Sequence, residues 1–282
     1  RLVRLISATS ALALATVAVP TVARADHEPM HEKKGETSHK GKESRGKVFE
    51  AALADVDLRP DQKKAIDELK AEMEERHAPV KSAKRELMLA AADQIEKGAV
   101  DACELDSEIE AVAEAKAKAR PGDREAFEEL HSILDEDQRA RFVTSLKRHW
   151  DAFQRSHSPT TMAEKLARKL DLSGEQKDKV ESILKGLDEI REATHTEKRE
   201  RWAKMLDAFK GDEFELDKIA PTGDVKTKTT KAIESHLWAT DMIVSVLNED
   251  QRGKLADYIR DKAKGRESTA KSEAYGMSPS DD

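Results

Sequence analysis

The chain has 282 residues, of which 38% are charged and 38% are hydrophobic, and its formal net charge at pH 7 is −7. The acidic balance argues against a nucleic-acid partner, because binding to phosphates relies on concentrated lysine and arginine. Charges of both signs run along the whole chain, which indicates helices with charged outer faces rather than a tail of one sign. The single cysteine, Cys103, cannot form an internal disulfide. We expect it to be a small buried residue, with an intermolecular disulfide as the alternative.

Residues 1–25 have the features of a cleaved secretory signal peptide. Arg1 and Arg4 precede an apolar run. Ala23-Arg24-Ala25 then has the small-x-small pattern of a cleavage site, just before Asp26. An uncleaved membrane anchor is the alternative, but the run is short and contains Thr and Ser. Loss of the three arginines takes the formal charge from −7 to −10. The sequence therefore predicts export to a periplasm or to the outside of the cell, and we expect the periplasm.

Residues 26–45 form a polar segment without hydrophobic periodicity, for which we expect disorder. It contains His27, His31 and His39, the candidate ligands for a weak Zn or Cu site. Residues 27–31 read HEPMH and match the HExxH pattern of zinc peptidases, but Pro29 would lie inside the helix that this chemistry requires. A solvated tail is therefore the expectation, and no cofactor is expected beyond such weak metal binding.

Residues 46–150 are predicted to form a first unit of about four helices. A long helix is expected from Pro60 to about Glu96, ended by Gly98, and Pro79 should kink it. Its apolar residues recur every three or four positions, which is typical of one buried stripe that pairs with another helix. These residues are Ile66, Leu69, Met73, Val80, Ala83, Leu87 and Ala90.

The rest of the chain repeats this plan. The third helix of the first unit either passes or breaks at Pro121-Gly122, and the fourth should end at Trp150. Residues 151–161 are predicted to be a linker. Residues 162–264 then form a second unit of about four helices, and residues 265–282 a disordered polar tail.

A short motif occurs four times, twice in each unit. Residues 134–138 (LDEDQ) recur as residues 247–251 (LNEDQ), and looser copies are residues 58–62 (LRPDQ) and 172–176 (LSGEQ). The interval between the two copies is the same in both units to within one position, and so is the interval between matching copies of the two units. This spacing indicates an internal duplication of a unit of roughly 100 residues. The repeated residues are Leu58, Gln62, Leu134, Gln138, Leu172, Gln176, Leu247 and Gln251.

The motif also has a local meaning, because it carries the signals of a helix start. Asp135, Ser173 and Asn248 are good N-cap residues with Gln three positions later, which is the pattern of a capping box. At the first copy Arg59 replaces a good cap, but Pro60 follows at the favoured first helical position. The motif could therefore mark four helix starts and nothing more.

A Leu-Thr-x-x-Gln-type motif, present twice per unit with a long charged helical hairpin between the copies, resembles the Spy/CpxP family of periplasmic proteins. The resemblance covers roughly residues 47–149 and 162–264. It implies an all-α fold of tandem long antiparallel helical hairpins that form a Spy/CpxP-like cradle. The implied function is that of an ATP-independent chaperone for unfolded or misfolded envelope proteins. The acidic net charge departs from the basic concave face of the best-known chaperone of the family.

Two other functions stay open. A periplasmic metal-binding or metal-stress-responsive protein would use the three tail histidines as ligands. An adaptor would regulate a membrane sensor kinase by docking on its periplasmic domain. An enzyme is not expected, because no catalytic motif with the required context occurs.

Large apolar and basic residues in both units are the candidates for binding unfolded proteins. The alternative for the aromatic ones is that they fill the crossings between thin helices. The candidates are Lys84, Arg85, Lys198, Arg199, Trp202 and Trp238. Because the resemblance implies antiparallel dimers for single-unit relatives, two linked units could fold against each other. We therefore expect a monomer with a pseudo-two-fold axis, with a homodimer as the alternative.

Overall fold

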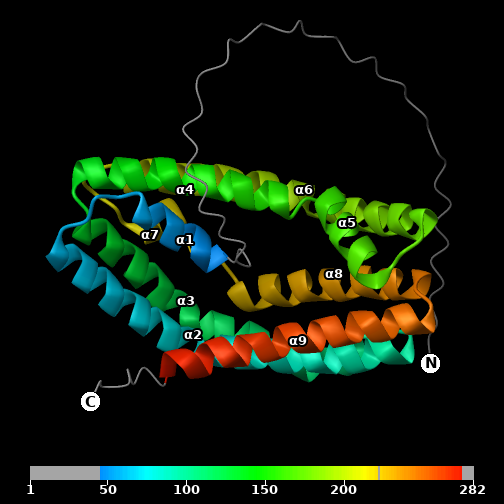
Figure 1. The fold of residues 1–282 in the computed structure, drawn as a ribbon. Helices are drawn as coiled ribbons and strands as arrows, with labels where there is room; N and C mark the ends of the chain where they lie inside the picture. Colours follow the sequence, from blue (N-terminus) through cyan, green and yellow to red (C-terminus); the bar gives the residue numbers. More distant parts are fainter. Residues whose placement is uncertain (1–44, 222, 275–282) are drawn as a thin grey trace, which may run out of the picture. The chain divides into compact units, whose positions relative to one another are not determined.

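A computed structural model describes residues 45–221 and 223–274, with their side chains except at residues 45, 191–198 and 266–274. All regular structure in these residues is helical, as the predicted all-α class requires. The first half contains α1 (Arg45–Ala54), α2 (Pro60–Lys97), the short 3-10 helix η1 (Ala102–Leu105), α3 (Asp106–Ile133) and α4 (Glu136–Ser156). The second half contains α5 (Pro159–Leu170), α6 (Gly174–Phe209), α7 (Leu216–Ile219), α8 (Val225–Val246) and α9 (Glu249–Ala274) (Figure 1).

The boundaries of the long helices follow from local signals. α2 begins at Pro60 and is followed by Gly98, whose φ of 98° places it in the left-handed region that favours glycine. The prolines inside the helices do not end them, because α2 continues through Pro79 and α3 through Pro121. The third helix of the first unit therefore passes Pro121-Gly122 without a break.

The structure corrects two predicted boundaries. α4 continues past Trp150 to Ser156, and α5 begins at Pro159, so residues 151–161 are mostly helical and do not form a linker. The side chain of Ser158 accepts a hydrogen bond from the backbone N–H of Thr161 and starts α5 as a new helix. α9 extends to Ala274 rather than ending near residue 264. Six of the ten added residues are Arg, Glu, Ala or Lys, which favour helix.

Two apolar clusters form the interior, and each contains residues from both halves. Core A lies between α1, the start of α2, the end of α3 and α4. It also includes four buried residues from the second half. Core B lies between α5, the start of α6, the end of α8 and α9. It also includes buried residues from the end of the α2–α3 hairpin. In core A the residues from the second half are Leu206, Phe209, Phe214 and Leu216. In core B the residues from the first half are Leu87, Ala91, Ala92, Ile95, Val100, Leu105, Ile109 and Val112.

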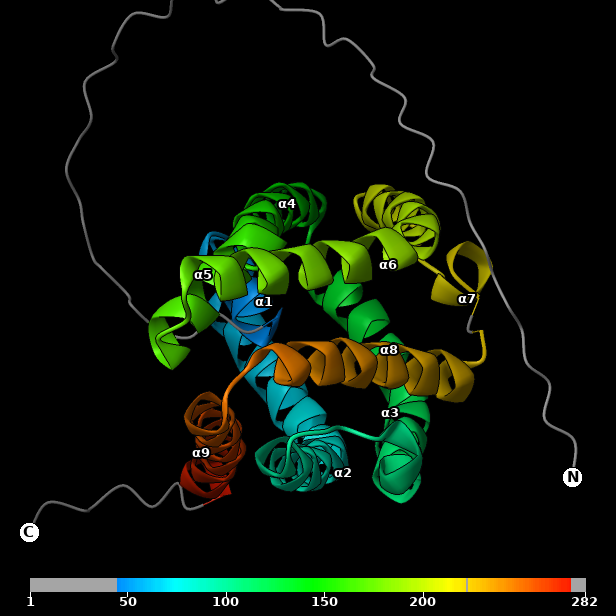
Figure 2. The same cartoon turned by 90° about the vertical axis from the view of Figure 1, so that its right-hand side faces the viewer.

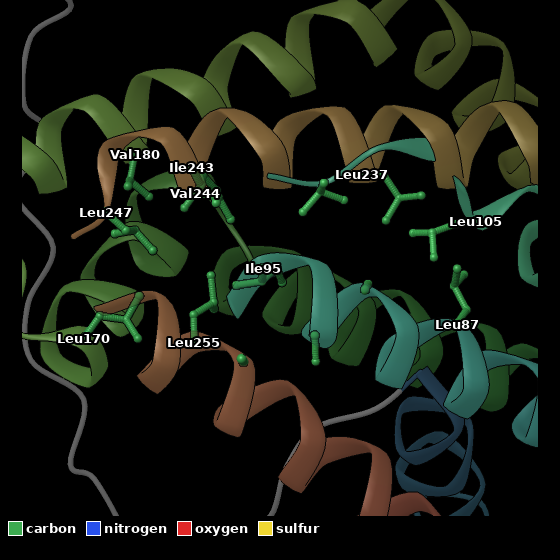
Figure 3. Packing of buried hydrophobic residues seen from close by; sticks show 14 of the residues in the cluster. Leu87, Ile95, Leu105, Leu170, Val180, Leu237, Ile243, Val244, Leu247 and Leu255 are labelled. Carbon is green, nitrogen blue, oxygen red and sulfur yellow. The ribbon is translucent and has the colours of Figure 1, made fainter. Parts of the chain in front are cut away.

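We call the chain between α2 and α3 the first tip (residues 98–105), and the chain between α6 and α8 the second tip (residues 210–224). Figure 3 shows Ile95, just before the first tip, near Leu255 of the second half, and Leu105, at the end of the tip, on the side of Leu237. Each tip thus contributes buried apolar side chains to the core of the other half, Val100 and Leu105 from the first tip and Phe214 and Leu216 from the second.

The long helices connect the two cores. α2 contributes Ile66 to core A and Ile95 to core B, and α3 contributes Leu130 to core A and Ile109 to core B. α2 packs along α3 and α9, α3 packs along α8, and α8 also packs against α6. In Figure 2, α8 lies between the α5–α6 pair and the row formed by α9, α2 and α3.

Some predictions concern residues that the structure does not describe. The signal peptide (1–25) and the histidine-containing tail up to residue 44 lie outside the described residues, as do residues 275–282. Among the helices that are described, none combines the length and the apolar character needed to cross a membrane.

Candidate functional site

The motif glutamines of the first half form a reciprocal pair. The amide of Gln62 donates to Oε1 of Gln138 (2.7 Å), and the amide of Gln138 donates to Oε1 of Gln62 (2.9 Å). Each amide also donates to a backbone carbonyl, Gln62 to Ile133 (2.7 Å) and Gln138 to Asp57 (2.8 Å). Both side chains are buried. The pair therefore fastens the start of α2 to the start of α4 with every amide hydrogen satisfied.

The second half contains the same arrangement. The amide of Gln176 donates to Oε1 of Gln251 (2.8 Å) and to the carbonyl of Val246 (3.0 Å). The amide of Gln251 donates to Oε1 of Gln176 (3.1 Å) and to the carbonyl of Asp171 (3.3 Å). This pair is more exposed, and several of its bonds are longer. The repeated motif thus closes the base of each long hairpin through two paired glutamines.

The predicted capping boxes are also present. Gln138 and Gln176 each accept from the backbone of their cap residue, and Asp135 and Ser173 accept in return. Gln251 and its cap residue exchange the same two bonds. At the first copy only half of the box forms, because the Arg59 side chain has no acceptor to offer; its backbone N–H donates to Gln62 (3.0 Å). The interpretation as four helix starts is therefore correct but incomplete, since it omits the glutamine pairs.

The arginine that follows each second motif glutamine contacts the tip of the other half. Arg139 donates to the carbonyl of Leu134 (3.1 Å) and forms an ion pair with Asp212 in the second tip (2.9 Å). Arg252 donates to the carbonyl of Leu247 (3.0 Å), and its guanidinium lies against Gly98 in the first tip. Equivalent arginines thus lie against both tips, and the one at the second tip forms an ion pair there.

A carboxylate on the long helix that follows the tip of each half also binds the opposite tip. Glu128 on α3 accepts from the backbone N–H of Leu216 (2.7 Å), and Asp241 on α8 accepts from the backbone N–H of Val100 (2.8 Å). The two acidic residues are separated by the same interval as the second motif copies of the two halves, which begin at Leu134 and Leu247. The contacts between the halves are therefore reciprocal.

Two further contacts occur only at the second tip. The buried His131 donates through Nε2 to the carbonyl of Gly211 (2.8 Å), and its ring centroid lies 5.2 Å and 5.1 Å from those of Phe209 and Phe214. Near the end of this tip, Arg124 donates to the carbonyl of Ala220 (2.8 Å). The equivalent positions of the second half, 244 and 237, carry Val and Leu. The two tips are thus held by related but unequal sets of contacts.

The basic residues predicted to bind unfolded proteins are only partly available on the surface. Lys84 and Arg85 are half-buried on α2. Arg199 is exposed on α6, whereas the side chain of Lys198 lies outside the described part of the chain. The contribution that these side chains would make to binding stays a prediction.

The two predicted tryptophans lie in different environments. Trp202 packs against core A, with its ring centroid 6.0 Å from that of Trp150 and 6.4 Å from that of Phe49. Trp238 on α8 is 49% exposed. Met242, one helical turn further along α8, is 37% exposed and was not singled out from the sequence. Trp202 therefore fills a helix crossing, and Trp238 and Met242 form an exposed apolar pair.

The described residues hold no group of three or more His, Cys, Asp or Glu side chains that could bind a metal ion. His27, His31 and His39 lie outside the described residues. The expectation that Cys103 is buried is wrong, because its thiol is exposed on η1. The buried residue of this helix is Leu105, and the Asp101 side chain accepts from the Cys103 backbone N–H to start the turn.

A serine, a histidine and an aspartate meet at the end of α1, but not in the order of a catalytic triad. Ser145 and His149 both donate to Oδ2 of Asp55, as does Arg148 at 2.6 Å. These bonds, led by the one from Ser145, lower the pKa of Asp55. In a triad the histidine lies between the other two residues, whereas here the carboxylate does. The cluster therefore tethers the α1–α2 connection to α4, beside an open hollow of about 560 Å³.

Residues 45–146 match the sequence profile described as LTXXQ motif family protein. This segment belongs to the LTXXQ motif family. The match contains both Gln62 and Gln138 and covers a little over one third of the chain. No curated protein and no solved structure matches the chain. The family consists of Spy/CpxP-like envelope proteins and is not an enzyme family.

Replacement of Gln138 by leucine is expected to lower the free energy of unfolding by about 3 kcal/mol. It removes both hydrogen bonds between Gln138 and the buried Gln62, and it leaves the Asp57 carbonyl and the Asp135 backbone N–H without this partner. Urea unfolding followed by circular dichroism measures the change. Gln251→Leu is the matched control, and its cost should be about half as large because the second pair is more exposed and several of its bonds are longer. Equal costs at the two positions would show that burial does not set the strength of the motif.

Proposed function

We propose that the protein is a periplasmic, ATP-independent chaperone that binds unfolded or misfolded envelope proteins. Membership of residues 45–146 in the LTXXQ family supports an envelope role. The observation that carries the finer proposal is the exposure of large apolar side chains on otherwise charged helices. These are Met73 (38% exposed), Ile190 (61%), Trp238 (49%) and Met242 (37%).

Exposed apolar side chains of this size fit weak and reversible binding. Full burial of one such side chain contributes about 1.5–3 kcal/mol, and association consumes several kcal/mol of this gain. Contacts at one or two of these residues therefore hold an unfolded segment only briefly, so release does not require ATP. Methionine also adapts to varied apolar partners, because its unbranched side chain has several rotatable bonds.

We also infer that the two halves are copies of one unit and that the chain acts as a monomer with a pseudo-two-fold axis. The paired glutamines, the two arginines and the two carboxylates that bind opposite tips support this inference. In such a chain each half completes the core of the other, as the subunits of a dimer would. Light scattering of the purified chain distinguishes this monomer from the homodimer.

The test of the proposed function is suppression of aggregation. A chemically unfolded model protein is diluted in the absence of ATP and in the presence of a metal chelator, and its aggregation is followed by light scattering. We expect suppression at near-stoichiometric amounts of the chain, unchanged when residues 26–44 are removed. Absence of suppression overturns the proposal. Suppression that requires residues 26–44 would favour binding by the histidine-containing tail.

A further inference from the structure

Trp238 and Met242 lie on the face of α8 that points away from the interior. Leu237 and Val244, on the opposite side of the helix, are buried in core B. Residues four apart on a helix are neighbours on its surface, so the two exposed side chains form one continuous apolar patch. We call this pair the α8 patch.

The two halves provide an internal control for this patch. Alignment of the halves through their second motif copies pairs residues 112–133 of α3 with the residues of α8, and Glu128 and Asp241, which accept from the opposite tips, form one such pair. The burial of the side chains agrees with this alignment. Ala126 and Ala239, which the alignment pairs, are 4% and 3% exposed. The two helices can therefore be compared residue by residue.

In the first half the positions of the α8 patch carry charge. Glu125 and Glu129, the counterparts of Trp238 and Met242 in this alignment, are both exposed on α3. The same place in the same fold thus tolerates two carboxylates, so packing does not require large apolar residues there. An exposed tryptophan that the fold does not need marks a surface that binds something else.

Two carboxylates of α8 lie beside the α8 patch. Glu234 precedes Trp238 by four positions and Asp241 follows it by three, so both flank its side chain on the helix surface. Asp241 binds the backbone of Val100, which brings the first tip to the side of the patch. On α8, the lysine of this face, Lys231, lies two turns away from the tryptophan.

The first tip and the start of α3 add further negative charge. Asp101 and Asp106, together with Glu234 on α8, raise the pKa of the exposed Cys103 thiol. The three carboxylates therefore lie around one spot where η1 meets α8. Negative charge beside an apolar patch favours partners that combine apolar side chains with positive charge.

We propose that the α8 patch docks segments of unfolded polypeptide in which apolar side chains alternate with lysine or arginine. The occupant follows from the two chemistries in contact: Trp238 and Met242 take the apolar side chains, and the carboxylates of Glu234 and the first tip take the cations. Because Glu125 and Glu129 replace the patch in the first half, each chain has one such site. This inference rests on the proposed function and names its substrate class.

Peptide binding tests the inference directly. Two fluorescent peptides carry the same leucine and phenylalanine residues, spaced by lysine in one and by glutamate in the other, and fluorescence anisotropy measures their Kd. We expect one lysine peptide per chain, bound at least about tenfold more tightly than the glutamate peptide, with the difference reduced at high salt. Equal affinity for the two peptides overturns the inference.

Matched variants localise the site. Trp238→Gln combined with Met242→Gln is expected to weaken binding of the lysine peptide at least about tenfold, since two buried apolar contacts are lost. Glutamine resembles in size the glutamates that the first half accommodates, so the fold should be retained. The control variant, Glu125→Gln with Glu129→Gln, should bind as the unmodified chain does. Glu234→Gln should reduce the preference for lysine over glutamate.

The single thiol offers an independent readout. A photoreactive benzophenone attached to Cys103 should cross-link the lysine peptide, and the Trp238→Gln, Met242→Gln variant should lose this product. A cross-link of equal yield in the variant would place the peptide elsewhere and contradict the inference. If the variant instead converts a dimer into a monomer by light scattering, the patch is covered by a second copy of the chain and the inference is also wrong.

Failure of this inference can be separated from failure of the proposed function. If the unmodified chain does not suppress aggregation, the proposed function fails whatever the peptides do. If the unmodified chain and the Trp238→Gln, Met242→Gln variant suppress aggregation equally, the proposed function stands and the docking site at the α8 patch is rejected.

Discussion

Fragments 45–157 and 158–274 are each expected to lack a cooperative fold when purified alone, and to assemble into a stable complex when mixed. The cut between His157 and Ser158 removes no helix, because α4 ends at Ser156 and α5 begins at Pro159. What each fragment loses is the opposite tip, and with it one side of its own core.

Both fragments lose many of the apolar contacts that fill their cores. The first fragment keeps Phe127 and Phe142 but loses Phe209, whose ring centroid lies 4.8 Å and 5.5 Å from theirs. The second fragment keeps Leu237 and Val244 but loses Leu105 from core B. An amphipathic hairpin without a partner for its apolar face retains little stability in water.

Urea titration followed by circular dichroism tests this expectation at equal concentrations of the fragments, their mixture and the uncut chain 45–274. The mixture should unfold cooperatively with the mass of one complete chain by light scattering. A fragment that is monomeric and unfolds cooperatively on its own would contradict the shared cores. A fragment that folds only as a dimer of itself would show that a second copy can replace the missing half.

The helical class and the helix starts follow from the sequence, because apolar spacing and capping residues act over a few positions. The pairing of Gln62 with Gln138 does not follow in this way. Their regular spacing was visible as a repeat, but a repeat does not say which helix starts meet in space. The interpretation as a capping box was therefore correct while the tertiary role of the motif was missed.

The environments of the tryptophans and of the cysteine show the same limit. Trp202 and Trp238 have the same chemistry and both lie on long helices, yet one packs against core A and the other is 49% exposed. The exposure of Cys103 depends on which side of η1 faces core B. The sequence does contain one signal of the exposure of Trp238, because alignment of the halves through their second motif copies places Trp238 opposite Glu125. An exposed carboxylate in one copy indicates that its counterpart is also exposed.

Replacement of Phe209 by alanine should lower the free energy of unfolding by about 4 kcal/mol, which is the cost of removing a fully buried aromatic ring. The residue belongs to α6 of the second half, but its ring lies in core A beside Phe127 and Phe214. Ile190→Ala on the same helix is the control. Because Ile190 is 61% exposed, its replacement should change stability by less than about 0.5 kcal/mol.

The form of the unfolding curve carries as much information as the loss of stability. α2 and α3 each run through both cores, from Ile66 to Ile95 and from Ile109 to Leu130. Disruption of core A by Phe209→Ala should therefore weaken core B as well, and the variant should still unfold in a single transition at lower urea. A curve that splits in two, with only one step shifted, would show that the cores unfold separately and that the long helices do not couple them.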